Sequence, residues 1–265
     1  MSTLVDVKQH ENIAEVALNR PEAYNAFNLE MITELARHLT RLATDESVKG
    51  VVLYGEGKAF CAGGDLKWAV QFSERPGSSF HTLAAQLHLA ISEIRRMEKP
   101  VVAAVHGAAA GAGFSLALAC DFRVVEESAT MKQAYTSNGL SIDGGGSFIL
   151  PRIVGLARAL EIAAFDDPIS SQQAAKWGLA TKVVKDGTSR TEAVQMLNRL
   201  MVRSLHSFGW SKRLLNDSFG NSFEYHLEIE REGLSACADH PDGREGLKAF
   251  VEKRSPVFSD PAKGS

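Results

Sequence analysis

The residues best suited to chemistry are a run of glycine and alanine that ends at Gly111, Ala112 and Gly113. Residues 101–105, just before it, form a short apolar run of strand type, and the residues after it follow helical spacing. The first N–H groups of such a helix lack intrahelical partners, and glycine and alanine do not screen them. This turn could therefore hold a ligand oxygen on bare amides. Close packing of a helix on a sheet would explain the same glycines, and from this stretch alone that explanation is favoured.

The other residues that could take part in catalysis or binding each have an ordinary structural explanation as well. The segment FCAGGDLK, residues 60–67, is a second glycine-marked turn, and Asp143 in GLSIDGGGS stands before a glycine, which is a common turn pair. His88 lies at the edge of an apolar helical stripe, where histidine is more often a packing residue than a catalyst. Ser115 in GFSLA is one residue short of a nucleophile elbow, because Ala117 replaces the second glycine. A serine hydrolase is therefore disfavoured.

The elements around these residues indicate an α/β protein. Strands are expected at intervals of roughly 40 residues, with helices between them, as in repeated strand-and-helix units. The expected strands are residues 12–18, 51–54, 101–105, 122–125 and 179–184. The expected helices follow a cap at Asn28, run from 83 to 97, form two short segments between 155 and 177, and occupy 191–206, 221–238 and 243–253. Residues 74–80 are expected to be a loop, and a soft boundary near 200 divides a core, 1–200, from a helical region, 201–265.

Composition limits the classes of partner. The chain has 265 residues, 45% of them hydrophobic, with 29 basic and 32 acidic residues, so it has no basic field for nucleic acid or an anionic membrane. No segment is long and apolar enough to span a membrane, and no signal-peptide core is present, so a cytoplasmic location is expected. Three widely spaced cysteines form no metal-ligand or disulfide pattern. A dinucleotide fold is excluded because no G-x-G-x-x-G or P-loop occurs.

Five segments in order resemble the crotonase (enoyl-CoA hydratase/isomerase) superfamily. They are ALNRPEAYNAFN, FCAGGDLK, AVHGAAAGAGFSLALACD, PRIVGLARALEIAAF with AAKWGLATKVV, and EGLKAFVEKRSPVF. The resemblance implies a spiral of ββα units with a helical C-terminal region that trimerises, often into a hexamer of two trimers. It also implies an acyl-CoA substrate, with no cofactor beyond the coenzyme A of the substrate and no metal.

The resemblance also implies roles for particular residues. The backbone N–H groups of Gly64 and Ala112 would face the thioester oxygen, although the second position is commonly glycine in this family. The residues expected along the coenzyme A path are Ala62, Asp65, Leu66 and Lys67, and those expected at its nucleotide end, often from a neighbouring subunit, are Phe250 and Lys253.

The resemblance narrows the reaction but leaves alternatives. The two glutamates of the hydratases correspond to Ser115 and Tyr135, so a plain hydratase is disfavoured. Asp143 falls where many Δ3,Δ2-enoyl-CoA and epoxyphenylacetyl-CoA isomerases carry an acidic residue, so an isomerase is favoured, with His88, Tyr135 and Ser115 in its pocket. In 4-chlorobenzoyl-CoA dehalogenases the same two positions, Asp143 and His88, carry the nucleophile and the base, although their tryptophan is Tyr135 here. A non-catalytic protein that binds acyl-CoA is the third alternative.

Overall fold

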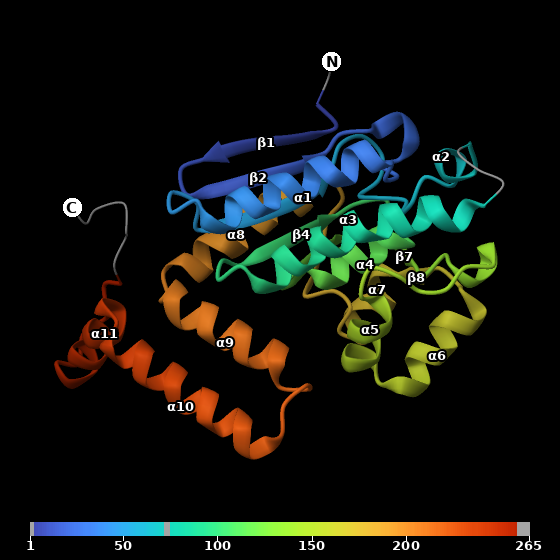
Figure 1. Cartoon of the computed structure of the whole chain (residues 1–265). Coiled ribbons are helices and arrows are strands. Elements are labelled where there is room, and N and C mark those ends of the chain that lie inside the picture. Colours follow the sequence, from blue (N-terminus) through green and yellow to red (C-terminus); the bar gives the residue numbers. More distant parts are fainter. Residues whose placement is uncertain (1–2, 72–74, 259–265) are drawn as a thin grey trace.

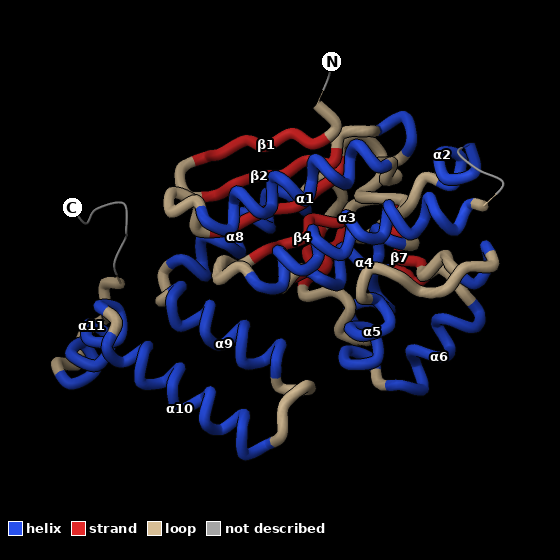
Figure 2. Tube along the Cα trace, in the orientation of Figure 1, coloured by secondary structure: helices blue, strands red, loops and turns tan. Residues whose placement is uncertain are grey.

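The computed structural model describes residues 3–71 and 75–258, and its centre is a β-sheet covered by helices (Figures 1 and 2). This part of the chain forms a six-stranded sheet in the order β1-β2-β3-β4-β6-β9, in which only β1 and β2 pair antiparallel. The strands are β1 (Val5–His10), β2 (Ile13–Leu18), β3 (Gly50–Gly55), β4 (Val101–Val105), β6 (Phe122–Glu126) and β9 (Lys182–Val184). The five strands expected from the sequence are confirmed. β1 was missed because it is a polar edge strand that buries Val5 fully and little else.

Alternation along the strands separates two apolar layers. Val51 and Leu53 of β3 belong to a cluster with α1 (Leu29–Thr44) and α3 (Pro76–Arg96), whereas Val52 and Tyr54 belong to a cluster with α8 (Ser189–Met201). Successive side chains of a strand point to opposite faces, so a central strand covered on both faces must be apolar throughout. Helices therefore cover both faces of the sheet, and the layer of α1 and α3 is the one that leads to the site described below.

The predicted helix ends hold at α1 but not at the start of α3. The Asn28 side chain caps α1 by accepting from the Met31 N–H, as expected. Residues 76–80, expected to be a loop, instead form the first turns of α3, with Pro76 in the first turn, where its missing N–H costs nothing. The remaining part of that expected loop includes Glu74, which lies outside the described residues. The predicted end at Met97 is confirmed to within one residue, since α3 ends at Arg96 and Met97 is its C-cap.

A second, three-stranded sheet lies beside the first. It consists of β5 (Ala108–Ala110), β7 (Thr130–Lys132) and β8 (Ile169–Ser170), and an isolated bridge joins Cys61 to Ala109. β5 follows β4 and leads into α4 (Ala112–Ala119), and β7 follows β6 in the same way. The chain thus winds in ββα units, and the predicted crotonase-like spiral is confirmed. Strands this short carry no periodicity of their own, which is why the sequence did not reveal them.

The remaining helices complete the spiral and extend from it. Their bounds are η1 (Pro21–Ala23), α2 (Leu66–Gln71), η2 (Thr136–Asn138), α5 (Gly146–Val154), α6 (Leu156–Phe165), α7 (Ser171–Lys176), α9 (Leu205–Asp217), α10 (Phe223–Asp239) and α11 (Pro241–Val251). α6 and α7 were predicted, and Ser170 caps α7 through a capping box with Gln173. The sequence analysis missed α5 and α9. α5 contains Pro151, a residue that usually ends a helix. α9 buries the charged Lys212, which interrupts the apolar pattern of its buried face.

The C-terminal helices project from the spiral (Figure 1). α10 and α11 expose large apolar side chains, among them Phe223, Leu234 and Phe250. Such faces are suited to contact with another chain, but trimerisation and the boundary near residue 200 stay predictions. In the described ranges no helix is long and apolar enough to cross a membrane.

Candidate active site

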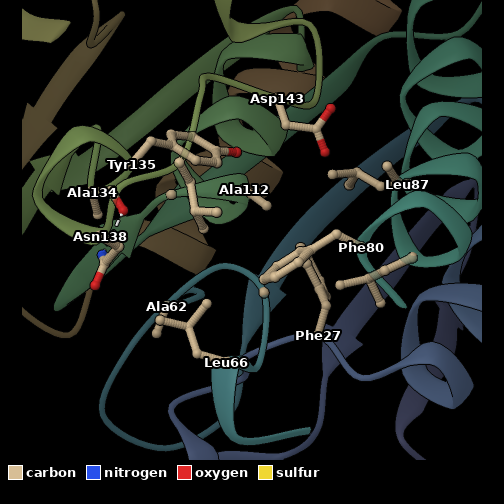
Figure 3. A pocket seen from close by; sticks show the side chains of 15 residues that line it. Phe27, Ala62, Leu66, Phe80, Leu87, Ala112, Ala134, Tyr135, Asn138 and Asp143 are labelled. Carbon is tan, nitrogen blue, oxygen red and sulfur yellow. Dashed lines mark hydrogen bonds between the residues drawn. The ribbon is translucent and has the colours of Figure 1, made fainter. Parts of the chain in front are cut away.

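A small cavity lies where the two glycine-marked turns meet α3 (Figure 3). Its volume is about 100 Å³. The side chains that line it are mostly apolar, and three polar ones, Tyr135, Asn138 and Asp143, join them. The other lining residues are Phe27, Ala62, Gly64, Leu66, Phe80, Leu83, Ala84, Leu87, Gly111, Ala112, Ala134 and Leu140. The structure therefore brings Gly64, Ala112, Tyr135 and Asp143 to one place.

Gly64 presents a free amide to this cavity. It forms an isolated parallel bridge with Phe27, whose N–H donates to the Gly63 carbonyl at 2.6 Å and whose carbonyl accepts from the Asp65 N–H at 2.9 Å. In a parallel pairing the residue between two bonded neighbours directs its own N–H to the other side. No residue of the described chain accepts a hydrogen bond from the Gly64 N–H, which is left for a ligand.

Ala112 presents the second free amide. It is the first residue of α4, and Gly111 before it has φ 53° and ψ −126°, a conformation open to glycine. The Ala112 N–H has no acceptor within residues 3–71 and 75–258, as expected at the start of a helix. The positive end of the helix dipole adds to the attraction for a negative oxygen. Gly113 is required behind it, since a Cβ there would lie 2.3 Å from the Cys61 carbonyl oxygen.

Two side chains near the N-terminus hold the first turn in place. The buried Asn25 amide donates to the Glu56 and Ala59 carbonyls at 2.9 and 2.8 Å. Arg20 donates to the Asp65 carboxylate at 2.6 Å, and the Asp65 carboxylate also accepts from the Trp68 N–H. Burial raises the pKa of Asp65, but these bonds and the Arg20 charge outweigh it, so the pKa lies below its usual value. Asp65 does not line the cavity and braces the turn, and its place along the coenzyme A path stays a prediction.

Asp143 lies across the cavity from Ala62 and Leu66, with Ala112 between them (Figure 3). Its Oδ1 atom is 2.6 Å from His88 Nε2 on α3, while Oδ2 accepts no hydrogen bond from any described residue. His88 itself does not line the cavity, and its side chain is 56% exposed, against 36% for Asp143. The carboxylate thus connects the cavity with an imidazole at the surface.

Ser115 supports Asp143 from behind and does not line the cavity, contrary to expectation. Its buried hydroxyl donates to the Asp143 carbonyl at 2.7 Å. The loop lies so close that a Cβ on Gly146 would be 2.7 Å from the Ser115 hydroxyl, and one on Gly144 would be 3.0 Å from the Ser115 Cβ. A buried hydroxyl whose proton is already donated to a carbonyl is a poor nucleophile, so the geometry also disfavours a serine hydrolase.

Tyr135 lines the same wall, with its hydroxyl buried behind the surface of the cavity. Its side chain is 7% exposed, and burial raises the pKa of its phenol well above the usual value. The buried hydroxyl has no partner at hydrogen-bond geometry among the described residues, but the Ser115 hydroxyl and the Asp143 backbone lie near enough to lower its pKa in part. Figure 3 shows it directed toward the side of the cavity where Asp143 lies.

Asp166 was missed by the sequence analysis, because it stands in a short turn with no motif. Its buried carboxylate accepts hydrogen bonds from the Ala134 and Ser137 N–H groups and from the Ser137 hydroxyl. Burial raises the pKa of Asp166, but the hydrogen bonds outweigh it and hold the pKa below its usual value. These bonds flank Tyr135 on both sides and fix the wall that carries it.

The remaining predicted residues divide into two groups. Ala62 and Leu66 line the cavity, and Lys67 is exposed beside them. Phe250 is 84% exposed, and Lys253 follows the end of α11. Figure 1 shows α11 on the other side of the molecule from α2, so neither residue reaches the cavity of its own chain. A neighbouring copy would be needed to place them at a coenzyme A.

The fold and the paired amides are features of enzymes that act on acyl thioesters through a stabilised oxyanion. The profile of the enoyl-CoA hydratase/isomerase family matches residues 8–261, and the chain belongs to this family, the crotonase superfamily, whose members process acyl-CoA.

The relatives of this chain are named for different reactions. The chain is 34% identical to 1,2-epoxyphenylacetyl-CoA isomerase of Escherichia coli, over 94% of this chain and 95% of that protein. It is 31% identical to 4-chlorobenzoyl coenzyme A dehalogenase-2 of an Arthrobacter species, over 94% and 91%. The crystal structure of an enoyl-CoA hydratase from Polaromonas superposes with a TM-score of 0.90 at 36% identity, covering 96% of this chain and 99% of that one. The reaction must therefore be argued from the side chains.

Proposed function

We propose that the protein is an acyl-CoA isomerase that shifts a double bond, or rearranges a related acyl group, by moving one proton. The observation that carries this proposal is a single carboxylate, Asp143, in an apolar cavity that two free amides, of Gly64 and Ala112, also line. Ser115 and Tyr135 stand where hydratases carry glutamates, so no second carboxylate is available to activate water.

The proton transfer needs only these groups. Asp143 Oδ2 removes a proton from C2 or C4 of a 3-enoyl or 2-enoyl thioester, and the electron pair moves onto the thioester oxygen. The Gly64 and Ala112 amides stabilise that enolate oxygen, and one such donor contributes about 2.7–4 kcal/mol to the transition state. Asp143 then returns the proton to the other carbon. The base ends each cycle as it began, so no cofactor or metal is required.

The coenzyme A portion is proposed to leave the cavity past Ala62, Leu66 and Lys67. Phe250 and Lys253 of a neighbouring copy would meet its nucleotide end, which makes a homotrimer or a homohexamer the proposed assembly. Exposed apolar residues on α10 and α11 support contact between copies.

Mass spectrometry of purified protein with a 3-enoyl-CoA, in deuterated water and separately in heavy-oxygen water, tests the proposal. Conversion to the 2-enoyl isomer without uptake of heavy oxygen supports it. Asp143→Asn should bind substrate but lose turnover by at least about 100-fold, within the range of general acid–base catalysis. Equal turnover in Asp143→Asn and wild type would exclude Asp143 as the base. Tight binding without turnover of any acyl-CoA would favour the non-catalytic alternative.

A dehalogenase-like or hydrolytic reaction is the second candidate, and the contact between His88 and Asp143 favours it. Asp143 would attack a halogen-bearing ring carbon, the halide would leave, and water deprotonated by His88 would cleave the resulting ester. His88→Ala distinguishes the candidates. It should slow an isomerase less than tenfold, because Asp143 keeps its free oxygen, but it should leave an uncleaved Asp143 ester in a dehalogenase, which peptide mass spectrometry with 4-chlorobenzoyl-CoA would detect.

A further inference from the structure

A salt bridge folds the chain that follows α11 back along that helix. The Arg254 guanidinium donates to both oxygens of the Glu245 carboxylate, at 2.5 and 2.9 Å. The same carboxylate accepts from the Val257 N–H at 2.8 Å. The bonds from Arg254 first, and then the bond from Val257, lower the pKa of Glu245 to about 2, so this carboxylate is ionised at neutral pH. These two side chains and the Val257 N–H are called the clasp below.

The clasp encloses Lys253, whose backbone conformation is unusual for a lysine. α11 ends in a Schellman motif, in which the Arg254 N–H donates to the Ala249 carbonyl at 3.0 Å and the Lys253 N–H donates to the Phe250 carbonyl at 3.2 Å. Glycine usually occupies the left-handed position of this motif, but here it is Lys253, with φ 54°. A side chain at this position costs free energy, and such strain is characteristic of residues with a function.

The Lys253 ammonium is available to a ligand. It is exposed, and none of the described residues accepts a hydrogen bond from it or forms an ion pair with it. The two nearby carboxylates are engaged by Arg254, since Glu245 binds its terminal nitrogens and Glu252 accepts from its Nε at 2.7 Å. Residues 245–254 include two acidic and three basic residues, so this stretch carries a net positive charge. A free cation on a fixed backbone is suited to bind an anionic group such as a phosphate.

We propose that Glu245 and Arg254 are positioning residues, whose clasp holds Lys253 for contact with the phosphates of a coenzyme A bound to a neighbouring copy. This inference rests on the proposed assembly and coenzyme A path, because α11 lies on the other side of the molecule from α2 (Figure 1). The clasp itself touches no substrate and acts through Lys253. A backbone that is already ordered strengthens binding, because less conformational entropy is lost when the ligand binds.

Ligands with and without the nucleotide test this role by binding alone. Calorimetry compares butanoyl-CoA with butanoyl-pantetheine, which lacks the nucleotide and its phosphates. Lys253→Ala should bind butanoyl-CoA at least about ten-fold more weakly, the value of one charge-assisted hydrogen bond. Glu245→Gln should bind it about three- to ten-fold more weakly, the value of one ordered side chain. Neither variant should bind butanoyl-pantetheine differently from wild type, and Glu232→Gln, at an exposed position of α10, is the matched control.

The direction of the effect in Glu245→Gln separates positioning from charge. This variant removes a negative charge and frees Arg254, so charge alone would strengthen the binding of a phosphate. Weaker binding therefore identifies loss of order, and hydrogen exchange of residues 249–257 should become faster. Binding of butanoyl-CoA by Glu245→Gln that equals or exceeds that of wild type would overturn the inference.

A double variant tests whether Glu245 acts through Lys253. Glu245→Gln with Lys253→Ala should bind butanoyl-CoA no more weakly than Lys253→Ala alone. Additive losses, or equal weakening for both thioesters, would overturn the inference. Sedimentation would also overturn it, by showing a monomeric wild type or a loss of assembly in Glu245→Gln. The proposed isomerase reaction fails separately, by absence of turnover of a 3-enoyl-CoA while the nucleotide-dependent difference in binding persists.

Discussion

Gly63 packs directly against the amide of Ala112: a Cβ on Gly63 would lie 3.0 Å from the Ala112 nitrogen and 2.8 Å from the Ala110 carbonyl oxygen. The two turns that supply the proposed oxyanion donors thus fix each other. Gly63 also has φ 94°, which side chains rarely allow. The spacing of the two donors depends on the absence of a side chain at this one residue.

Gly63→Ala should therefore displace the Ala112 amide and lower kcat by about 100- to 1000-fold, the loss expected for one oxyanion donor. Steady-state kinetics with a 3-enoyl-CoA measures the effect. Gly77→Ala is the matched control, because a Cβ there meets no atom within 4 Å. Wild-type kcat in folded Gly63→Ala would argue against Ala112 as a donor.

Ser115→Ala should impair both stability and activity through Asp143. It leaves the Asp143 carbonyl without its buried donor, which costs about 1–3 kcal/mol in the free energy of unfolding, and it loosens the loop that carries the base. The free energy of unfolding, measured with urea, and kcat should both decrease. Ser92→Ala, at an exposed position of α3, should change neither. An unchanged kcat would show that Ser115 does not position Asp143.

Asp166→Asn should weaken the wall that carries Tyr135, with an effect that depends on pH. The pKa of Asp166 is lowered in the folded protein, so its ionised form contributes stability above its unfolded value of 3.8, and this contribution is lost as the pH falls through the lower folded pKa. At pH 7 the amide of asparagine meets N–H donors, and we expect a loss of about 1–3 kcal/mol. The free energy of unfolding of both proteins is measured from pH 7 to pH 3. The difference between Asp166→Asn and wild type should become smaller below pH 4. A constant difference would contradict this role.

Lys212→Met should detach α9 from the core. The Lys212 ammonium donates to Asp121 at 2.8 Å and to the Ile94 and Lys99 carbonyls at 2.7 and 3.1 Å, and its side chain is 4% exposed. Loss of one partner of a buried ion pair destabilises by about 3–5 kcal/mol. Denaturant unfolding measures it, and Lys212→Met with Asp121→Asn should recover part of the loss. A double variant less stable than the single one would show that the charge of Asp121 is not the source.

Local patterns determined much of the fold. The five strands expected from the sequence all joined one sheet, because a strand covered on both faces must be a continuous apolar run. Asn28 marked the start of its helix because a cap bonds only to residues in the next turn. Gly64 and Ala112 were identified through the order of the family motifs. The sequence did not predict the strands β5, β7 and β8. Each has only two or three residues, so it is defined by its pairing with a neighbouring strand and not by a pattern in its own residues.

What only the tertiary structure decided is which side chains meet. The contacts of Arg20 with Asp65, of Ser115 with the Asp143 carbonyl, of His88 with Asp143 and of Asp166 with the Tyr135 wall all join separate elements. They place Ser115 behind the cavity as a support of Asp143, and they give Asp65 a bracing contact in the first turn. Periodicity and capping act over a few residues, whereas these contacts depend on how the ββα units pack, and no local pattern contains that information.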